Sequence, residues 1–204
     1  MTTKSLLHSS LLDNQYYNSM LVGNDAFSPL SSDYDLIQSI ELSSAGDIDF
    51  DLTGLNSTYH TLELRGSFRT TKADKDDAIG VRFNNDSTTS AYIRSTIDYQ
   101  GSSVRAITDA LEYGRIGDAS AANASGAVFF PISATINFPF ETSQYTSWIS
   151  TSGIYDNGTG YYRISQDNGY WNNKTTVTSI KLFSTAGADL AIGTKVELYG
   201  LRVV

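Results

Sequence analysis

Apolar and polar residues alternate along most of the chain after Leu36. A period of two puts the apolar side chains of an extended strand on one face and the polar side chains on the other. Leu62 and Leu64 follow this period, as do Val196 and Leu198 near the end of the chain. The pattern covers residues 36–42, 48–52, 59–68, 78–84, 91–99, 126–138, 144–155, 160–165, 176–183 and 193–204. We therefore predict roughly eight to ten strands in an all-β, antiparallel sandwich.

Turn-forming residues separate these segments. Asn157-Gly158 and Asn168-Gly169 are Asn-Gly pairs, the strongest short signal for a hairpin turn, and we predict a turn at each. After Gly200 the apolar positions shift by one residue, which predicts a β-bulge at that glycine. Residues 103–111 are ambiguous, and a short helix is one interpretation of them.

The first 35 residues lack the alternation and are predicted to form an extended N-terminal arm, with the sandwich domain in residues 36–204. A mobile tail is the other interpretation of this segment. We favour an arm that orders against a neighbouring subunit or a partner, because solvated tails seldom carry so many leucines and aromatic residues. The candidate contact residues are Leu6, Leu7, Leu11, Leu12, Tyr16 and Tyr17.

Composition excludes several classes of function. The net charge is −8, which opposes binding to nucleic acid or to an anionic membrane surface. The chain has no cysteine, which removes disulfides, thiolate nucleophiles and the usual structural zinc sites. No apolar run approaches the roughly 18 residues that a membrane-spanning helix needs, and the N-terminus lacks a convincing secretory signal.

No catalytic motif stands out, so we predict that the chain is not an enzyme and carries no cofactor or metal. The acidic run 47–51 is best interpreted as the solvated face of a strand, and the mixed-charge run 72–77 as a hairpin tip. Asp98, Glu112, Glu141 and Asp156 could supply paired carboxylates for glycoside hydrolysis, but nothing in the sequence selects a pair.

Aromatic residues cluster in the C-terminal half, mostly beside predicted turns. Aromatic rings that alternate along strands usually fill a core or a subunit interface, where they bury a large area. Exposed rings instead stack on sugar rings, so carbohydrate binding is the second interpretation. The candidates for exposed aromatic residues are Tyr161, Tyr162, Tyr170 and Trp171.

Four blocks of sequence resemble a pattern in small virion proteins of tailed phages, many from cyanobacterial and marine hosts. The blocks are YHTLELRG at 59–66, VRFNND at 81–86 followed by Tyr92, VTSIKL at 177–182, and the LYG ending at 198–200, with a glycine- and tyrosine-rich region at 155–171. The resemblance covers residues 36–204, and Asn85 stands where the pattern has a glycine. It implies a jelly-roll-like sandwich that assembles on a virion, often as a trimer, without an active site.

The resemblance leads to a specific expectation. The chain would be a head decoration or cement protein on the capsid exterior, a homotrimer that bridges copies of the major capsid protein and stabilises the shell by binding across them. The alternative is a tail-fibre or receptor-binding domain that recognises host surface glycan.

Overall fold

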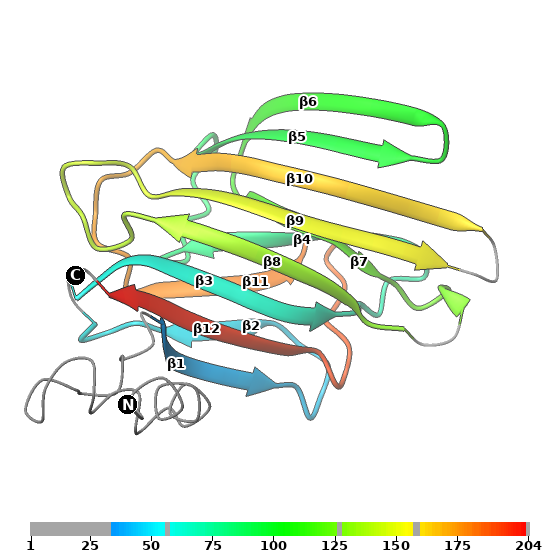
Figure 1. Cartoon of the computed structure of the whole chain (residues 1–204), viewed down its shortest axis with the longest axis horizontal. Helices are drawn as coiled ribbons and strands as arrows, with labels where there is room; N and C mark the ends of the chain where they lie inside the picture. The colour runs from blue at the N-terminus through cyan, green and yellow to red at the C-terminus, as the bar shows by residue number, and fades with distance from the viewer. Residues whose placement is uncertain (1–33, 56–57, 126–127, 157–159, 203–204) are drawn as a thin grey trace, which may run out of the picture. The chain divides into compact units, whose positions relative to one another are not determined.

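The computed structural model describes residues 34–55, 58–125, 128–156 and 160–202 (Figure 1). The chain divides into two units, residues 1–34 and Asp35–Val204, and nearly all described residues belong to the second. The six predicted arm contacts, from Leu6 to Tyr17, lie outside the described residues.

Twelve strands make up the described part of the chain, which contains no helix. The larger sheet has eight strands in the order β1 (Tyr34–Glu41), β12 (Lys195–Arg202), β3 (Tyr59–Phe68), β8 (Phe130–Asn137), β9 (Ser147–Asp156), β10 (Tyr161–Trp171), β5 (Tyr92–Gln100) and β6 (Ser103–Leu111). The smaller sheet has the order β2 (Ile48–Asp51), β11 (Ser179–Ser184), β4 (Asp76–Phe83) and β7 (Gly114–Ser120). Every pairing for which a register is given is antiparallel.

The two sheets pack face to face around one hydrophobic core, with the smaller sheet behind the larger one in Figure 1. The inward residues are those that the period of two selects, such as Leu62 and Leu64 on β3 and Val196 and Leu198 on β12, all at most 2% exposed. Aromatic rings from both sheets meet in this core, where Phe83 packs against Trp148 and Trp171. The predicted all-β, antiparallel, jelly-roll-like sandwich is confirmed.

Two local interpretations are wrong, and one strand was not predicted. Residues 103–111 form strand β6 and not a helix, because they pair along their whole length with β5 through the turn at Gly101 and Ser102. Asn168-Gly169 is not a turn, because it lies inside β10 and pairs on one side with β9 and on the other with β5. Strand β7 was not predicted, since all of its residues are buried and no alternation marks it. The Asn157-Gly158 turn lies outside the described residues.

The irregularity predicted at Gly200 lies one step later, where the register of β12 with β3 shifts between Leu201 and Arg202. Gly200 itself faces the ring of Tyr59, and a Cβ atom there would lie 2.4 Å from that ring. The glycine therefore makes room for an aromatic ring, and the bulge follows it.

Candidate functional site

The outer face of the eight-stranded sheet carries an exposed apolar surface over β9, β10, β5 and β6. The antiparallel registers place Ile164 opposite Tyr99, and Tyr99 opposite Val104, in one row across three strands. Ile164 is 61% exposed and Val104 is 69% exposed. With Ile97 and Tyr155, these residues form what we call the apolar patch.

Sequence reasoning missed most of this patch. A strand whose outer face is also apolar does not show the clean alternation of a half-buried strand, so alternation alone does not distinguish an exposed isoleucine such as Ile97 from a buried one. The signal that could have found the patch is the excess of isoleucine, valine and tyrosine at both parities in 91–107 and 160–165.

Of the four predicted exposed aromatic residues, Trp171 is a correction. It is 1% exposed, its ring packs on Phe83, and its indole Nε1 donates a hydrogen bond to Asp86 at 2.8 Å. Trp171 is the last residue of β10 and occupies one of the alternate positions whose side chains point inward, so its side chain lies in the core. It cannot serve as a platform for a sugar ring.

The other three predicted residues are partly exposed. Tyr161 lies on the inward side of β10, where its hydroxyl donates to Asp76 at 2.8 Å. Tyr162 lies on the outer side, 5.7 Å from the ring of Tyr99 between centroids, and its hydroxyl donates to the carbonyl of Gly101. Tyr162 therefore adjoins the apolar patch.

Tyr170 is 37% exposed on the same outer face. Its ring centroid lies 5.4 Å from that of Tyr145, and the ammonium of Lys174 lies 4.8 Å above the Tyr145 ring. This pair forms a second, smaller aromatic group near the end of β10.

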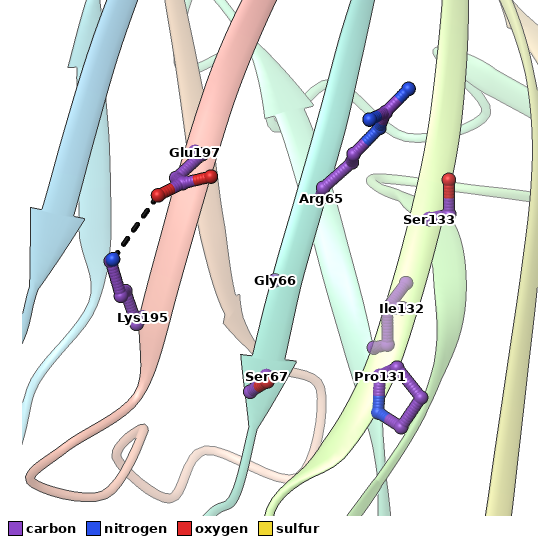
Figure 2. Close-up of a pocket in the computed structure, with 8 residues that line it drawn as sticks. All are labelled: Arg65, Gly66, Ser67, Pro131, Ile132, Ser133, Lys195 and Glu197. Carbon is purple, nitrogen blue, oxygen red and sulfur yellow. Dashed lines mark ion pairs between the residues drawn. The ribbon is translucent and has the colours of Figure 1, made fainter.

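A shallow hollow of about 450 Å³ lies beside the apolar patch, over β12, β3 and β8 (Figure 2). Its floor is made of small side chains, Ser67, Pro131 and Ser133, and a neighbouring hollow continues over Thr151 and Gly153 of β9. The outer face thus has an apolar side, a band of small residues and a charged side.

The charged side of the hollow is an ion-pair network on β3 and β12. Arg65 makes two hydrogen bonds to Glu63, at 2.8 and 2.9 Å, and its guanidinium lies 5.4 Å from the centroid of the Tyr199 ring. Glu197 accepts a hydrogen bond from the Tyr199 hydroxyl at 2.6 Å and pairs with Lys195 at 3.1 Å (Figure 2). The hydrogen bonds from Tyr199 and Lys195 lower the pKa of Glu197.

A second group of charges lies inside the sandwich, where β10 and β5 face β7 and β4. Arg163 bonds to Asp76 at 2.7 Å and to Asp98 at 2.8 Å, and its Nε lies 3.2 Å from Asp118. Arg115 bonds to Asp118, and its Nε lies 3.5 Å from Asp167. We call these six residues the buried ionic cluster: Asp76, Asp98, Asp118, Asp167, Arg115 and Arg163.

The cluster holds carboxylates whose pKa values move in opposite directions. Burial raises the pKa of Asp118 and of Asp167, despite the positive charge of Arg115 beside both. Burial alone would also raise the pKa of Asp98, but hydrogen bonds from Arg105 and Arg163 bring it below its ordinary value. Raised and lowered carboxylates side by side are a feature of acid–base catalysis.

Access argues against a catalytic role for these acids. The side chains of Asp98, Asp118 and Asp167 are at most 1% exposed, so a substrate cannot reach them without opening the sandwich. Structural ion-pair networks perturb pKa values in the same way. The cluster therefore joins strands, and the accessible outer face is the better candidate for recognition.

The structure agrees with the interpretation of the acidic run 47–51 and differs from that of the mixed-charge run 72–77. In 47–51 the carboxylates of Asp49 and Asp51 are exposed on β2, as predicted for a solvated face, and Asp47 pairs with Lys181 at 2.8 Å. In 72–77 the hairpin-tip interpretation is wrong, because the run connects β3 and β4, which belong to different sheets, and its last two residues already lie in β4. Asp77 is buried and accepts a hydrogen bond from Ser184 at 2.5 Å.

No group of three or more histidine, aspartate or glutamate side chains in the described ranges is arranged to hold a metal ion. Within the same ranges, no helix has the length and apolar character that crossing a bilayer requires.

No family model matches the chain, and no curated protein does. Among solved structures, a galectin of Caenorhabditis elegans aligns with 81% of this chain and 96% of its own, at 7% identity and a TM-score of 0.32. An engineered GH43 glycoside hydrolase aligns with 84% of this chain and 36% of its own, at 13% identity and a TM-score of 0.36. TM-scores this low carry no argument about what the present chain binds or does.

Proposed function

We propose that this chain is a non-enzymatic structural protein of a tailed-phage virion, a decoration or cement protein that binds the capsid exterior through the outer face of its eight-stranded sheet. The observation that carries the proposal is the apolar patch. A sheet face that leaves Ile164 and Val104 more than 60% exposed in the same row is typical of a surface that another protein covers.

The charge of the chain fits the same role. With a net charge of −8 and only 18% charged residues, the surface is suited to a protein partner and not to a polyanion. The partner suggested by the resemblance of residues 36–204 to phage virion proteins is the major capsid protein. A protein that bridges several shell subunits stabilises the shell, because opening it would break those contacts.

The experiment is to add the purified chain to phage heads that lack it and to measure the bound fraction by sedimentation. We expect Ile164→Asp to weaken binding about ten- to a hundredfold, since burying one isoleucine side chain contributes about 1.5–3 kcal/mol. The matched control is Ile192→Asp, in a turn outside the patch, because Ile192 is 62% exposed and Ile164 is 61% exposed.

Binding to heads that is unchanged by Ile164→Asp would show that the apolar patch is not the contact surface. A protein found only at the tail, in few copies, would contradict the decoration role and would favour the second candidate.

The second candidate is a tail-fibre or receptor-binding domain that recognises glycan, and the hollow beside Arg65 favours it. Its charged side combines the guanidinium of Arg65 with the carboxylate of Glu197 over a floor of small residues, a combination that can hydrogen-bond a sugar. In this case a glycan array would detect binding that Arg65→Ala abolishes. Arg202→Ala is the control, because Arg202 is an exposed arginine paired with Asp35, outside the hollow.

A further inference from the structure

Strand β6 forms one edge of the eight-stranded sheet. It is nine residues long and pairs along its whole length with β5, and among the described strands none pairs with its other side. An edge strand presents unpaired N–H and C=O groups to any strand that approaches. Natural proteins often block such an edge with proline, lysine or a bulge, and β6 has none of these.

The residues of β6 are arranged symmetrically about Ile107. Arg105 precedes Ile107 by two positions and Asp109 follows it by two, and all three alternate onto the same face of the strand. An antiparallel pair of identical strands related by a two-fold axis at Ile107 therefore places Arg105 of each copy opposite Asp109 of the other.

We propose that a second copy of this chain pairs with the first through β6, antiparallel and centred on Ile107. The result is one continuous sheet that runs through both copies, with an interface of the isologous type in which the same surface serves both partners.

The charges already present within each copy support this register. Asp109 accepts two hydrogen bonds from Arg94 on β5, at 2.5 and 2.9 Å. Arg105 donates two hydrogen bonds to Asp98 on β5, both at 2.9 Å. Across the two-fold axis each row would contain, in order, Arg94 and Asp109 of one copy and then Arg105 and Asp98 of the other. Positive and negative side chains therefore alternate along the row.

Other registers lose this complementarity. A pairing centred on Arg105 places that arginine opposite Arg105 of the other copy, and a pairing centred on Asp109 places two aspartates opposite each other. Both pairings put like charges together, which is destabilising. Centring the pair on residue 106 or 108 leaves both charges opposite uncharged side chains. Among registers that keep inward residues facing inward residues, the one centred on Ile107 pairs opposite charges on both sides of the axis.

Inward-pointing charges on an edge strand can also serve to prevent pairing. Here each charge is held by a partner of opposite sign on β5, so the edge does not present an uncompensated charge to the incoming strand. On the outer face, Val104 would lie opposite Ala110 and Ala106 opposite Thr108, which are small or apolar pairs. The pairing goes beyond the proposed function and does not depend on what the apolar patch binds.

A cysteine placed at the axis tests the register directly, because the chain has no cysteine of its own. In the proposed dimer residue 107 lies opposite itself, with Cα atoms about 4.5–5.5 Å apart, a separation that a disulfide can span. We expect Ile107→Cys to form a covalent dimer rapidly under mild oxidation. Val104→Cys is the control, since two copies of residue 104 would be roughly 20 Å apart.

The mass of the uncrosslinked full chain, measured by analytical ultracentrifugation, tests the association itself. We expect a species of twice the 22.2 kDa chain mass. Ala106→Lys with Thr108→Lys sets lysines against each other in both cross-strand pairs and should raise the dissociation constant about tenfold. Ala106→Lys with Thr108→Glu is the matched control, because it sets lysine against glutamate and should preserve the dimer.

Three results would overturn the proposal. One is a monomer at protein concentrations up to about 1 mM. Another is a trimer, the state that the phage resemblance implies, whose mass is unaffected by the paired lysines. The third is disulfide formation that is no faster at residue 107 than at residue 104.

Discussion

At the scale of single residues, two glycines determine how the sandwich holds Trp148. Gly114 on β7 and Gly169 on β10 both lie against the Cζ2–Cη2 edge of its indole, and a Cβ atom at either position would lie 2.7 Å from the ring. The indole Nε1 then donates to the carbonyl of Arg115 at 2.8 Å. The absence of two side chains, one from each sheet, thus creates the slot for the largest side chain of β9.

This packing predicts that alanine destabilises the protein much more at Gly169 of β10 than at Gly153 of the neighbouring strand β9. A Cβ atom at Gly169 would also lie 2.3 Å from the backbone oxygen of Ile93, which cannot move aside. Gly169→Ala should lower the free energy of unfolding by about 1–3 kcal/mol, as overpacking does. Gly153→Ala is the control, because its nearest neighbour is a backbone oxygen at 4.0 Å. Urea unfolding measures both, and equal stability of the two variants would contradict the packing argument.

At the scale of elements, the buried ionic cluster joins strands of the two sheets. Arg163 of β10 pairs with Asp98 of β5 in its own sheet and with Asp76 of β4 and Asp118 of β7 in the other. Ser152 and Ser165 extend the polar region by hydrogen-bonding each other at 2.7 Å, and Ser152 also accepts from the backbone N–H of Asp118. This end of the sandwich is therefore joined by ion pairs where the rest is joined by apolar contacts.

Removing one cation from this cluster should be costly. Arg163→Met leaves three carboxylates without their shared partner in a site where Asp98 and Asp118 are almost inaccessible to water. We expect a loss of about 3–5 kcal/mol in the free energy of unfolding, the usual effect of breaking a buried pair. Arg65→Met, which breaks an exposed pair with Glu63, should cost no more than about 1 kcal/mol. A similarly small loss of unfolding free energy for both variants would mean that water solvates the carboxylates that Arg163→Met leaves unpaired.

At the scale of the whole molecule, the opposed pKa shifts predict how stability depends on pH. The folded chain binds protons at Asp118 and Asp167 more tightly than the unfolded chain, because burial raises both pKa values. The resulting stabilisation is lost as the pH rises through those raised values, so stability should increase as the pH falls toward the ordinary aspartate pKa of 3.8. The stabilising contribution of Asp98, whose pKa is lowered, is present above 3.8 and is lost as the pH falls through its folded value.

The expected profile has a maximum on the acidic side of neutrality and a decline below the ordinary aspartate pKa of 3.8. Chemical denaturation at a series of pH values measures it. Asp118→Asn should flatten the rise between pH 7 and about 4, because the group that takes up the proton is gone. A wild-type stability that falls steadily over that interval would contradict the raised pKa values.

Much of the secondary structure could be predicted because alternation is a local property of the chain. Strand β3 has the bounds that its alternation predicts, 59–68, and the other predicted strands begin or end within a few residues of their segments. Strands β6 and β7 could not be predicted in this way. In β6 nearly every residue is exposed and in β7 every residue is buried, so neither shows a difference between faces.

The sequence predicted the candidate site less well than it predicted the fold. Of the predicted exposed aromatic residues, Tyr162 and Tyr170 lie on the outer face, but Trp171 is buried; it was expected to be exposed because it follows a tyrosine beside an expected turn. The turn does not exist, since β10 continues through Asn168 and Gly169 between two partners. Pairing on both sides of a central strand outweighs the local preference of an Asn-Gly pair.

The sequence by itself determined that this chain is an antiparallel sandwich and which parity of each regular strand faces the core, because burial of one strand face imposes a period of two. Only the tertiary structure decided which strands are neighbours. The same arrangement produces three features that no local sequence pattern contains. These are the row from Ile164 to Val104, the meeting of Arg163 with acids from three other strands, and the position of β6 at the edge. Each depends on residues that are distant in sequence and become neighbours only when the sheets form.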